Sequence, residues 1–194
     1  NLDKLYQLQT AHAGKPFFAH KTDVSIEQDC ENFMNETIKV FGKIDILVNN
    51  AGISMRALFS ETSLQTLRNV MEINFWGTVY CTKYALPHIL KTRGTVAGIS
   101  SIAGYRGLPG RTGYSASKFA VNGFFESLRT ELLETGVNVI WVCPGFTASN
   151  IRSAALTKDA TPQGTSPMDE GSMMTAEECA ALILKGIEKR KRNM

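Results

Sequence analysis

The sequence predicts an α/β fold in which a doubly wound parallel sheet lies between two layers of helices, a three-layer α/β/α arrangement. Strand-like apolar runs alternate with helical stripes of about a dozen residues or more, and such connections favour right-handed crossovers between parallel strands. The chain has 194 residues, 43% of them hydrophobic, without an internal repeat or a change in composition. These observations favour a single domain over residues 1–194.

The first quarter of the chain predicts two helices and two strands. Residues 2–8 are typical of the end of a helix, and residues 16–24 have a strand-like start. Apolar side chains at helical spacing predict a helix over residues 26–41, with Ser25 as its N-cap. Residues 43–50 are then expected to form a buried strand.

The middle of the chain predicts two longer helices around one strand. A helical stripe runs from Leu67 to Ala85, and the helix is expected to end at Pro87. Residues 95–100 are typical of a strand. After a glycine-rich loop, apolar side chains between residues 116 and 128 predict the next helix.

The last quarter predicts a strand, a long loop and a final helix. Residues 137–143 are typical of a strand. Residues 146–174 show no clear period and are expected to form a mobile loop or short helices. Thr175 is expected to cap a helix over residues 176–190.

Charge and hydropathy exclude two classes of partner. The net charge is +3, and the basic excess is confined to residues 185–192, whereas a nucleic-acid binder usually has a broader basic face. We interpret this tract as the solvated last turn of a helix rather than a membrane-surface or targeting patch. The longest apolar runs, such as residues 180–184, fall far short of the ~20 residues of a membrane helix, so no membrane span is expected.

Cysteine and histidine spacing predicts the compartment and argues against a metal site. The four cysteines are Cys30, Cys81, Cys143 and Cys179, and they form no C-x-x-C pair. The three histidines also lack the spacing of metal ligands. We therefore expect free thiols in a reducing, cytoplasmic compartment, and no bound metal.

Small, polar or glycine residues follow each of the expected strands. They are Asp23–Val24, Asn49–Gly52, Ser100–Ser101 and Pro144–Thr147. In open parallel sheets, ligands bind beyond the carboxyl ends of the strands. Each segment alone reads as an ordinary turn, but four of them along one edge predict a shared binding crevice.

Tyr114 and Lys118 are spaced to act together. On a helix, residues four apart share a face, so the phenol is expected beside the ammonium. At ~5 Å and an effective dielectric of ~20, the attraction between phenolate and ammonium is roughly 3 kcal/mol. This would lower the tyrosine pKa by about two units and suit the phenol to general acid–base catalysis. The motif alone is weak, because about 0.3 such pairs are expected by chance in a chain of this composition.

Two further polar residues accompany this pair. Ser101 lies at the end of a strand, upstream of Tyr114. Asn74 lies on the apolar stripe of its helix, where it is either a functional residue or a buried, hydrogen-bonded asparagine.

The sequence resembles the short-chain dehydrogenases/reductases over essentially its whole length. The matching segments are Asp23–Val24, Asn49–Gly52, Asn74, Ser101, Tyr114–Lys118 and Pro144–Thr147. The resemblance implies a Rossmann-like fold. It also implies that Tyr114 donates or accepts the substrate proton and that Ser101 orients the substrate oxygen. Lys118 would lower the tyrosine pKa and hold the nicotinamide ribose, and Asn74 would anchor a water that links Lys118 to solvent.

The resemblance further implies how NAD or NADP binds. Asp23 and Val24 would contact the adenine, and Thr147 would hold the carboxamide. The other implied cofactor-binding residues are Asn50, Ala51, Gly52, Pro144, Gly145 and Phe146, with Tyr114 and Lys118. Residues 146–174 would form the substrate lid. The stripe on the Tyr114 helix, where Gly123 allows close approach, resembles the family's homodimer or homotetramer interface.

One feature of the family has no match in the sequence. The family has an N-terminal strand, glycine-rich turn and helix that cradle the pyrophosphate, whereas Gly104, Gly107 and Gly110 follow the wrong strand. We therefore expect the native polypeptide to continue upstream with these elements and to extend further at its C-terminal end. The residues that choose between NAD and NADP usually lie in that region, so neither cofactor is favoured.

The predicted function is hydride transfer between a nicotinamide cofactor and a carbonyl or secondary alcohol. Two alternatives stay open. One is a sugar-nucleotide epimerase or dehydratase, which usually has a larger C-terminal domain. The other is a non-catalytic dinucleotide sensor, which tends to lose the Tyr or Lys. Apolar residues in the expected lid, Leu156, Met168, Met173 and Met174, predict a partly apolar substrate.

Overall fold

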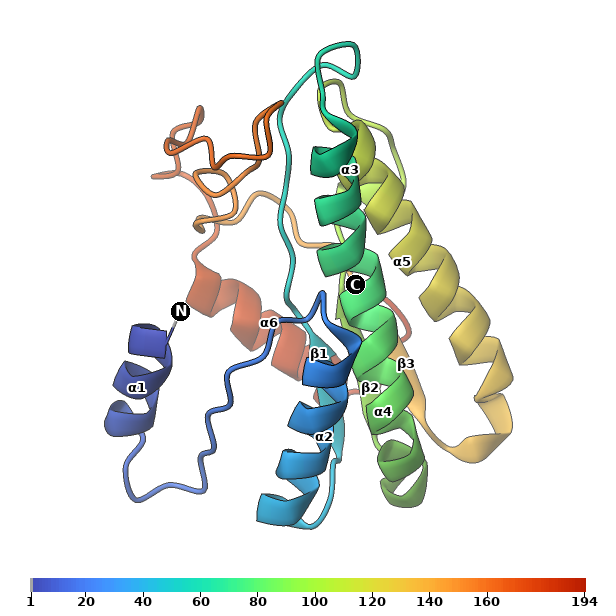
Figure 1. Ribbon diagram of the computed structural model, residues 1–194. Helices are drawn as coiled ribbons and strands as arrows, with labels where there is room; N and C mark the ends of the chain where they lie inside the picture. The colour runs from blue at the N-terminus through green and yellow to red at the C-terminus, as the bar shows by residue number, and fades with distance from the viewer. Residues whose placement is uncertain (1) are drawn as a thin grey trace.

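A three-stranded parallel sheet forms the centre of the computed structural model, which describes residues 2–194 (Figure 1). Its strands are β1 (Ile46–Asn49), β2 (Thr95–Ile99) and β3 (Asn138–Val142), in the order β1-β2-β3. The register pairs Val48 with Ala97, and Ala97 with Ile140. The parallel sheet of the α/β prediction is therefore confirmed.

Helices cover both faces of the sheet, which completes three layers. On one face lie α2 (Glu27–Phe41), α4 (Gly77–Thr92) and α5 (Thr112–Glu131), whose apolar side chains share one core with β2 and β3. On the other face, α6 (Ala176–Glu188) packs Ile187 against Ala97 and Ile140 (Figure 1). The α/β/α arrangement is thus also confirmed.

A single helical rod runs through α3 (Leu64–Met71), a π-helical turn (Glu72–Trp76) and α4. Its predicted end at Pro87 is wrong, because α4 continues to Thr92. Proline cannot donate a backbone hydrogen bond to the carbonyl four residues earlier, which belongs to Lys83. Both Pro87 and Lys83 are exposed, so water can satisfy that carbonyl and the helix is not broken.

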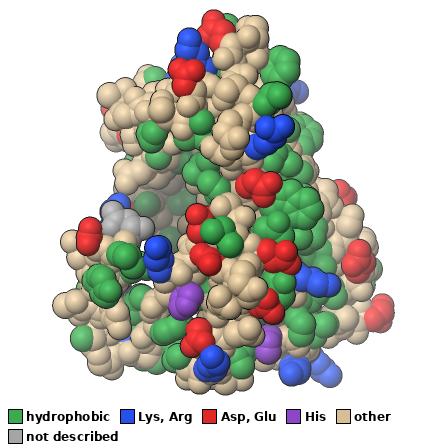
Figure 2. Space-filling model, viewed as in Figure 1, with side chains coloured by type: hydrophobic (Ala, Val, Ile, Leu, Met, Phe, Trp, Pro, Cys, Tyr) green, Lys and Arg blue, Asp and Glu red, His purple; other side chains and the backbone are tan. Residues whose placement is uncertain are grey.

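The remaining helices are short or peripheral. The turns η2 (Ile102–Gly104) and η3 (Leu133–Thr135) are 3₁₀-helical. Helix α1 (Leu2–Ala11) contains no buried residue and lies apart from the sheet (Figure 1). In Figure 2 the surface is hollowed between α1 and the body of the molecule.

The predicted strand within residues 16–24 is wrong, since this segment is extended or turned without pairing. A strand forms only where a neighbour accepts its backbone hydrogen bonds, and β1 pairs with β2 alone among the described residues. The predicted burial of residues 43–50 is also wrong in part. Ile46 and Val48 are 50% and 40% exposed.

The two predicted helix caps have different outcomes. Ser25 does not cap α2, whose N-cap is Ile26 without a side-chain bond. The Ser25 hydroxyl instead donates to Asp23 Oδ1 at 2.6 Å. Thr175, in contrast, caps α6 as predicted, and the Glu178 carboxylate accepts a hydrogen bond from the Thr175 amide.

The long loop over residues 146–174 contains no helix and is held by isolated bridges between residues far apart in sequence. Thr147 pairs with Met174, and Leu156 pairs with Met55. In the basic tract near the C-terminus, Arg190 is held against the body of the protein, because it donates to the carbonyls of Arg93 and Gly136. Within residues 2–194, no helix is both long and apolar enough to cross a membrane.

Candidate active site

The segments that follow β1, β2 and β3 lie at the same end of the sheet, at the top in Figure 1. This is the edge formed by the carboxyl ends of the parallel strands. Backbone hydrogen bonds join these segments, since Leu156 donates to Ser54 at 2.8 Å and Ala57 donates to Gly110 at 3.0 Å. The segments that the sequence predicts to line one crevice are therefore hydrogen-bonded to one another.

Asn74 lies in the π-helical turn and is 1% exposed. Its Oδ1 accepts from the Ile53 amide at 2.8 Å, and its Nδ2 donates to the Ile53 carbonyl and to Ser117 Oγ, both at 2.9 Å. The Thr78 hydroxyl donates to the Asn74 carbonyl at 2.9 Å, one turn further along the same rod. Asn74 therefore fastens the segment after β1 to the helix that carries Tyr114.

Tyr114 and Lys118 lie in the first turns of α5 and are 8% and 5% exposed. The Ser117 hydroxyl donates to the Tyr114 carbonyl at 2.7 Å, which links the Asn74 network to this turn. Lys118 Nζ donates to the Ile99 carbonyl at 2.8 Å and lies 5.8 Å from the centre of the Tyr114 ring. The ammonium is thus held at the end of β2, beside the ring.

The electrostatics of Tyr114 differ from the sequence-based expectation. Burial, the largest cause, raises the pKa of its hydroxyl above the ordinary value, while a hydrogen bond with Ser101 and the charge of Arg111 act to lower it. The predicted lowering of the Tyr114 pKa by Lys118 is therefore wrong for the protein alone. Burial also lowers the pKa of Lys118, to about 8. A lysine with this pKa is only partly protonated a little above neutral pH, which weakens it as a counter-charge.

The four residues predicted to be catalytic come together in the fold. Ser101, at the end of β2, contacts the Tyr114 hydroxyl, and its Oγ also accepts from the Ala103 amide at 3.1 Å. A Cβ atom at Gly52 would lie 3.2 Å from Asn74 Oδ1 and 3.6 Å from Lys118 Nζ, so the backbone of Gly52 approaches both. An amide, two hydroxyls and an ammonium therefore lie together at the sheet edge.

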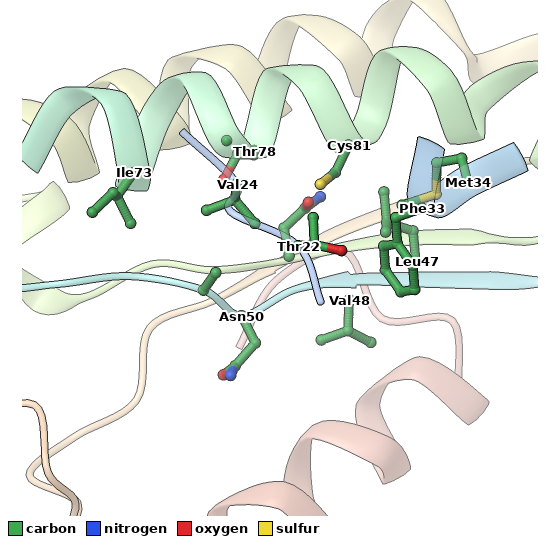
Figure 3. Close-up of a pocket in the computed structure, with 13 residues that line it drawn as sticks. Thr22, Val24, Phe33, Met34, Leu47, Val48, Asn50, Ile73, Thr78 and Cys81 are labelled. Atoms are coloured by element: carbon green, nitrogen blue, oxygen red, sulfur yellow. The ribbon is translucent and has the colours of Figure 1, made fainter. Parts of the chain in front are cut away.

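A pocket of about 180 Å³ lies beside β1, between residues 22–24 and the helices α2 and α4 (Figure 3). Of the predicted cofactor-binding residues it is lined by Val24, Asn50 and Ala51, but not by Asp23 or Gly52. In Figure 3 the side chains of Thr78 and Cys81 come from α4, with Thr78 next to Val24, whereas Asn50 points to the opposite side of β1. The volume equals that of roughly six water molecules, and the mainly apolar wall suits a planar base.

The Asp23 carboxylate, which is predicted to contact the adenine, bonds instead to its neighbours in the chain. Its Oδ1 accepts from both the amide and the hydroxyl of Ser25, at 3.0 and 2.6 Å, and these bonds lower the pKa of the carboxyl. The Asp23 amide donates to Asp29 Oδ2 at 3.0 Å. Asp23 therefore shapes the turn before α2, next to the pocket that Val24 lines.

The segment after β3 is open to solvent. Phe146 is 62% exposed, and a Cβ atom at Gly145 would meet nothing within 4 Å. The Thr147 hydroxyl donates to the Gly145 carbonyl at 3.3 Å, and the Thr147 carbonyl accepts from Arg152 Nη1 at 3.0 Å. Together with Pro144, this segment lies at the same edge as Ser101 but forms no part of the pocket beside β1.

Comparison with known proteins identifies the family. A model of the short chain dehydrogenase family matches residues 1–160. The chain belongs to this family. It is 38% identical over 167 residues to 11-beta-hydroxysteroid dehydrogenase-like 4A of Arabidopsis thaliana, a match that covers 85% of this chain and 54% of the relative. The chain spans about half the length of the curated relatives it matches.

Solved structures share the fold of this chain. A short-chain dehydrogenase from Streptomyces avermitilis superposes with a TM-score of 0.84 at 25% identity, covering 100% of this chain and 76% of that one. A variant of ElxO with NADPH bound superposes with a TM-score of 0.71 at 31% identity, covering 76% of this chain and 61% of that one.

Sequence reasoning missed three residues that shape the candidate site. Ser117 and Thr78 complete the network around Asn74, and Arg111 lies close to the Tyr114 hydroxyl. Ser117 lies within the Tyr114–Lys118 segment, and Arg111 lies one helical turn before Tyr114. The spacing of Ser117 and Arg111 from Tyr114 was therefore visible in the sequence, although the contacts of these residues were not.

Proposed function

We propose that the protein is an NAD(P)-dependent oxidoreductase that interconverts a carbonyl group and a secondary alcohol. The observation that carries the proposal is the meeting of Ser101, Tyr114 and Lys118 at the carboxyl edge of the sheet, in a chain of the short chain dehydrogenase family. The ElxO structure with NADPH bound supports a nicotinamide cofactor. NAD and NADP both remain within the proposal.

The nicotinamide cofactor would supply or accept the hydride, and residues of this chain would handle the proton. In the direction of carbonyl reduction, the Tyr114 hydroxyl donates its proton to the substrate oxygen, while Ser101 holds that oxygen by a hydrogen bond. The raised pKa of Tyr114 keeps the phenol protonated and suits it to this direction. In alcohol oxidation the same group must first lose its proton, so rates should rise with pH.

Lys118 and Asn74 would act behind Tyr114. Lys118 Nζ, on the Ile99 carbonyl, would donate to the ribose hydroxyls of the cofactor. Asn74 would hold Lys118 and the backbone of Gly52 at a fixed separation, and a water on this network would link Lys118 to solvent. Val24, Ala51 and the pocket beside β1 would take the adenine, and Thr147 would hold the carboxamide.

The same proposal includes a homo-oligomeric assembly and a partly apolar substrate. Hydrophobic side chains gather over α3 to α5 on the face seen in Figure 2, and Phe119 and Trp76 are 47% and 41% exposed. A Cβ atom at Gly123 would meet nothing within 4 Å, so α5 can be approached closely there. A homodimer or homotetramer would cover this face. Met168 and Met174, 42% and 36% exposed in the long loop, favour a partly apolar substrate.

The test is oxidation of NADH and of NADPH with a panel of ketones and aldehydes. Steady turnover that Tyr114→Phe abolishes supports the proposal. Tight cofactor binding without turnover on any substrate would replace it with a non-catalytic sensor of dinucleotides.

A further inference from the structure

Arg111 is a partly buried cation without a counter-charge, one turn away from the proposed proton donor. It immediately precedes α5 and lies three residues before Tyr114. Its Nη1 donates to Ser54 Oγ at 2.5 Å, and Ser54 is 1% exposed. Among residues 2–194, Arg111 forms no ion pair with a carboxylate.

Backbone hydrogen bonds bring a second arginine to the same place. The Leu156 amide donates to the Ser54 carbonyl, and the Arg56 amide donates to the Leu156 carbonyl, both at 2.8 Å. The Ala57 amide donates to the Gly110 carbonyl at 3.0 Å. Residues 54–57 therefore run between Arg111 and Leu156, which places Arg56 and Arg111 at one corner of the sheet edge.

This corner adjoins the reacting centre. Tyr114 packs in one apolar cluster with Met55 and Leu156, which belong to the segments that carry Ser54 and Arg56. The positive charge of Arg111 also acts to lower the pKa of Tyr114, so the two side chains lie near each other. The guanidinium of Arg111 thus lies on the side of Tyr114 formed by residues 54–57 and the long loop.

The third arginine near this corner, Arg152, differs from Arg56 and Arg111 because it has a carboxylate partner. Arg152 is matched by Glu170 at 3.1 Å and donates to the Thr147 carbonyl at 3.0 Å. Arg56 and Arg111 have no such partner within the described chain. A buried cation is costly unless an anion pairs with it. The hydrogen bond to Ser54 uses one of the five N–H donors of Arg111, which leaves enough for a two-point bond to a carboxylate.

We propose that the substrate carries a carboxylate, which Arg111 binds beside Tyr114 and which Arg56 attracts into the crevice. The substrate is then an oxo acid or hydroxy acid, with its reacting oxygen on Tyr114 and Ser101. This inference rests on the proposed function and narrows its substrate class. The fixed Ser54–Arg111 bond orients the guanidinium before the substrate arrives.

The experiment compares oxo acids with their methyl esters, using the full-length protein with NADH and NADPH. Each pair has the same carbonyl and carbon chain and differs only in the negative charge. We expect kcat/KM to be at least about tenfold higher for the acid, as for a charge-assisted hydrogen bond to a partly buried arginine. Arg111→Gln should bring the acid-to-ester ratio close to one, and Arg111→Lys should keep part of the preference.

The ratio separates the proposal from other roles of Arg111. A variant that merely slows Tyr114 lowers acid and ester turnover together and leaves the ratio unchanged. Arg68→Gln, at an exposed position on α3, is the matched control and should not alter the ratio. Equal turnover of acid and ester by the wild type would overturn the inference while the proposed function stands. An acid preference that survives Arg111→Gln would also overturn it.

A binding measurement covers the case in which no substrate of either kind is turned over. Calorimetric titration of the acid and its ester into the protein with NADPH present requires no chemistry. Acid binding that exceeds ester binding at least about tenfold, and that Arg111→Gln abolishes, supports the inference even where the proposed function fails. Failure of the acid to bind better than the ester overturns it.

Discussion

The Tyr114 hydroxyl is the group on which the proposed chemistry depends, and its surroundings pull its pKa in opposite directions. Burial favours the neutral phenol, whereas Ser101 and Arg111 favour the phenolate. Sequence spacing indicated the partner Lys118 but did not indicate the burial of Tyr114, which depends on residues of α3, η2 and the segment after β1. Arg111 was missed for the same reason, because its contact with Ser54 joins residues far apart in the chain.

Tyr114→Phe should lower turnover at least about 100-fold, since it removes the proton donor and keeps the ring. The fold should survive, with a loss near 1 kcal/mol for the bond to Ser101. Steady-state kinetics and thermal unfolding check both expectations. Tyr6→Phe, on exposed α1, is the control and should behave as wild type. A Tyr114→Phe enzyme with more than about a tenth of wild-type turnover would contradict the assignment.

Lys118 should make the unliganded protein more stable at alkaline pH. Its folded pKa of about 8 lies below the ordinary 10.5, so above pH 8 the unfolded state binds more protons and stability rises with pH. We expect a gain of about 1 kcal/mol between pH 8 and 9, which Lys118→Met should abolish. Urea unfolding at both pH values measures it.

Lys83→Met, at an exposed position on α4, should retain the gain seen in the wild type. If Lys118→Met keeps the same dependence on pH as the wild type, the depressed pKa is assigned to the wrong group.

At the scale of elements, the packing of α5 on β2 depends on a residue without a side chain. A Cβ atom at Gly98 would overlap the Phe125 ring, which is fully buried between the helix and the sheet. Phe125 shares its core with residues of α2 and α4. The distance between α5 and the sheet, and with it the position of Tyr114 and Lys118, is therefore set at Gly98.

Gly98→Ala should destabilise the protein by about 1–3 kcal/mol, because the ring must leave its preferred position. Gly123→Ala is the control within α5, where a Cβ atom meets nothing and alanine should stabilise the helix by about 0.5–1 kcal/mol. Chemical denaturation of the two variants measures the contrast. Equal stabilities would mean that Phe125 can repack without cost.

At the scale of the whole molecule, sequence patterns located the helices better than the strands. The stripes that predicted α2, α4, α5 and α6 are local, because a helix makes its hydrogen bonds within itself. A strand depends on neighbours, and residues 16–24 have a strand-like composition but no partner in the described chain. The four catalytic candidates were predicted from motifs, whereas the walls of the pocket beside β1 come from segments whose contact the sequence does not reveal.

The outer edge of β1 should make the 194-residue chain associate with itself. Ile46 and Val48 expose apolar side chains along a strand whose backbone is paired on one side among the described residues. Ile46→Lys should lower the average mass in solution at unchanged helix content, as measured by light scattering and circular dichroism. Leu133→Lys, at an exposed leucine away from the sheet edge, should have no such effect. An unchanged mass for Ile46→Lys would show that association uses a different surface.

The π-helical turn at Glu72–Trp76 fixes how α3 and α4 are rotated relative to each other. A π turn is equivalent to one residue inserted into a regular α-helix, and each residue of such a helix advances the side chains by about 100°. Deleting one codon within this turn would restore a regular helix and rotate α4 against α3. Asn74 could not then face Ile53 and Ser117 while Ala85 and Ile89 face the core. An alignment of related chains that differ by one residue here should therefore place its gap inside the turn.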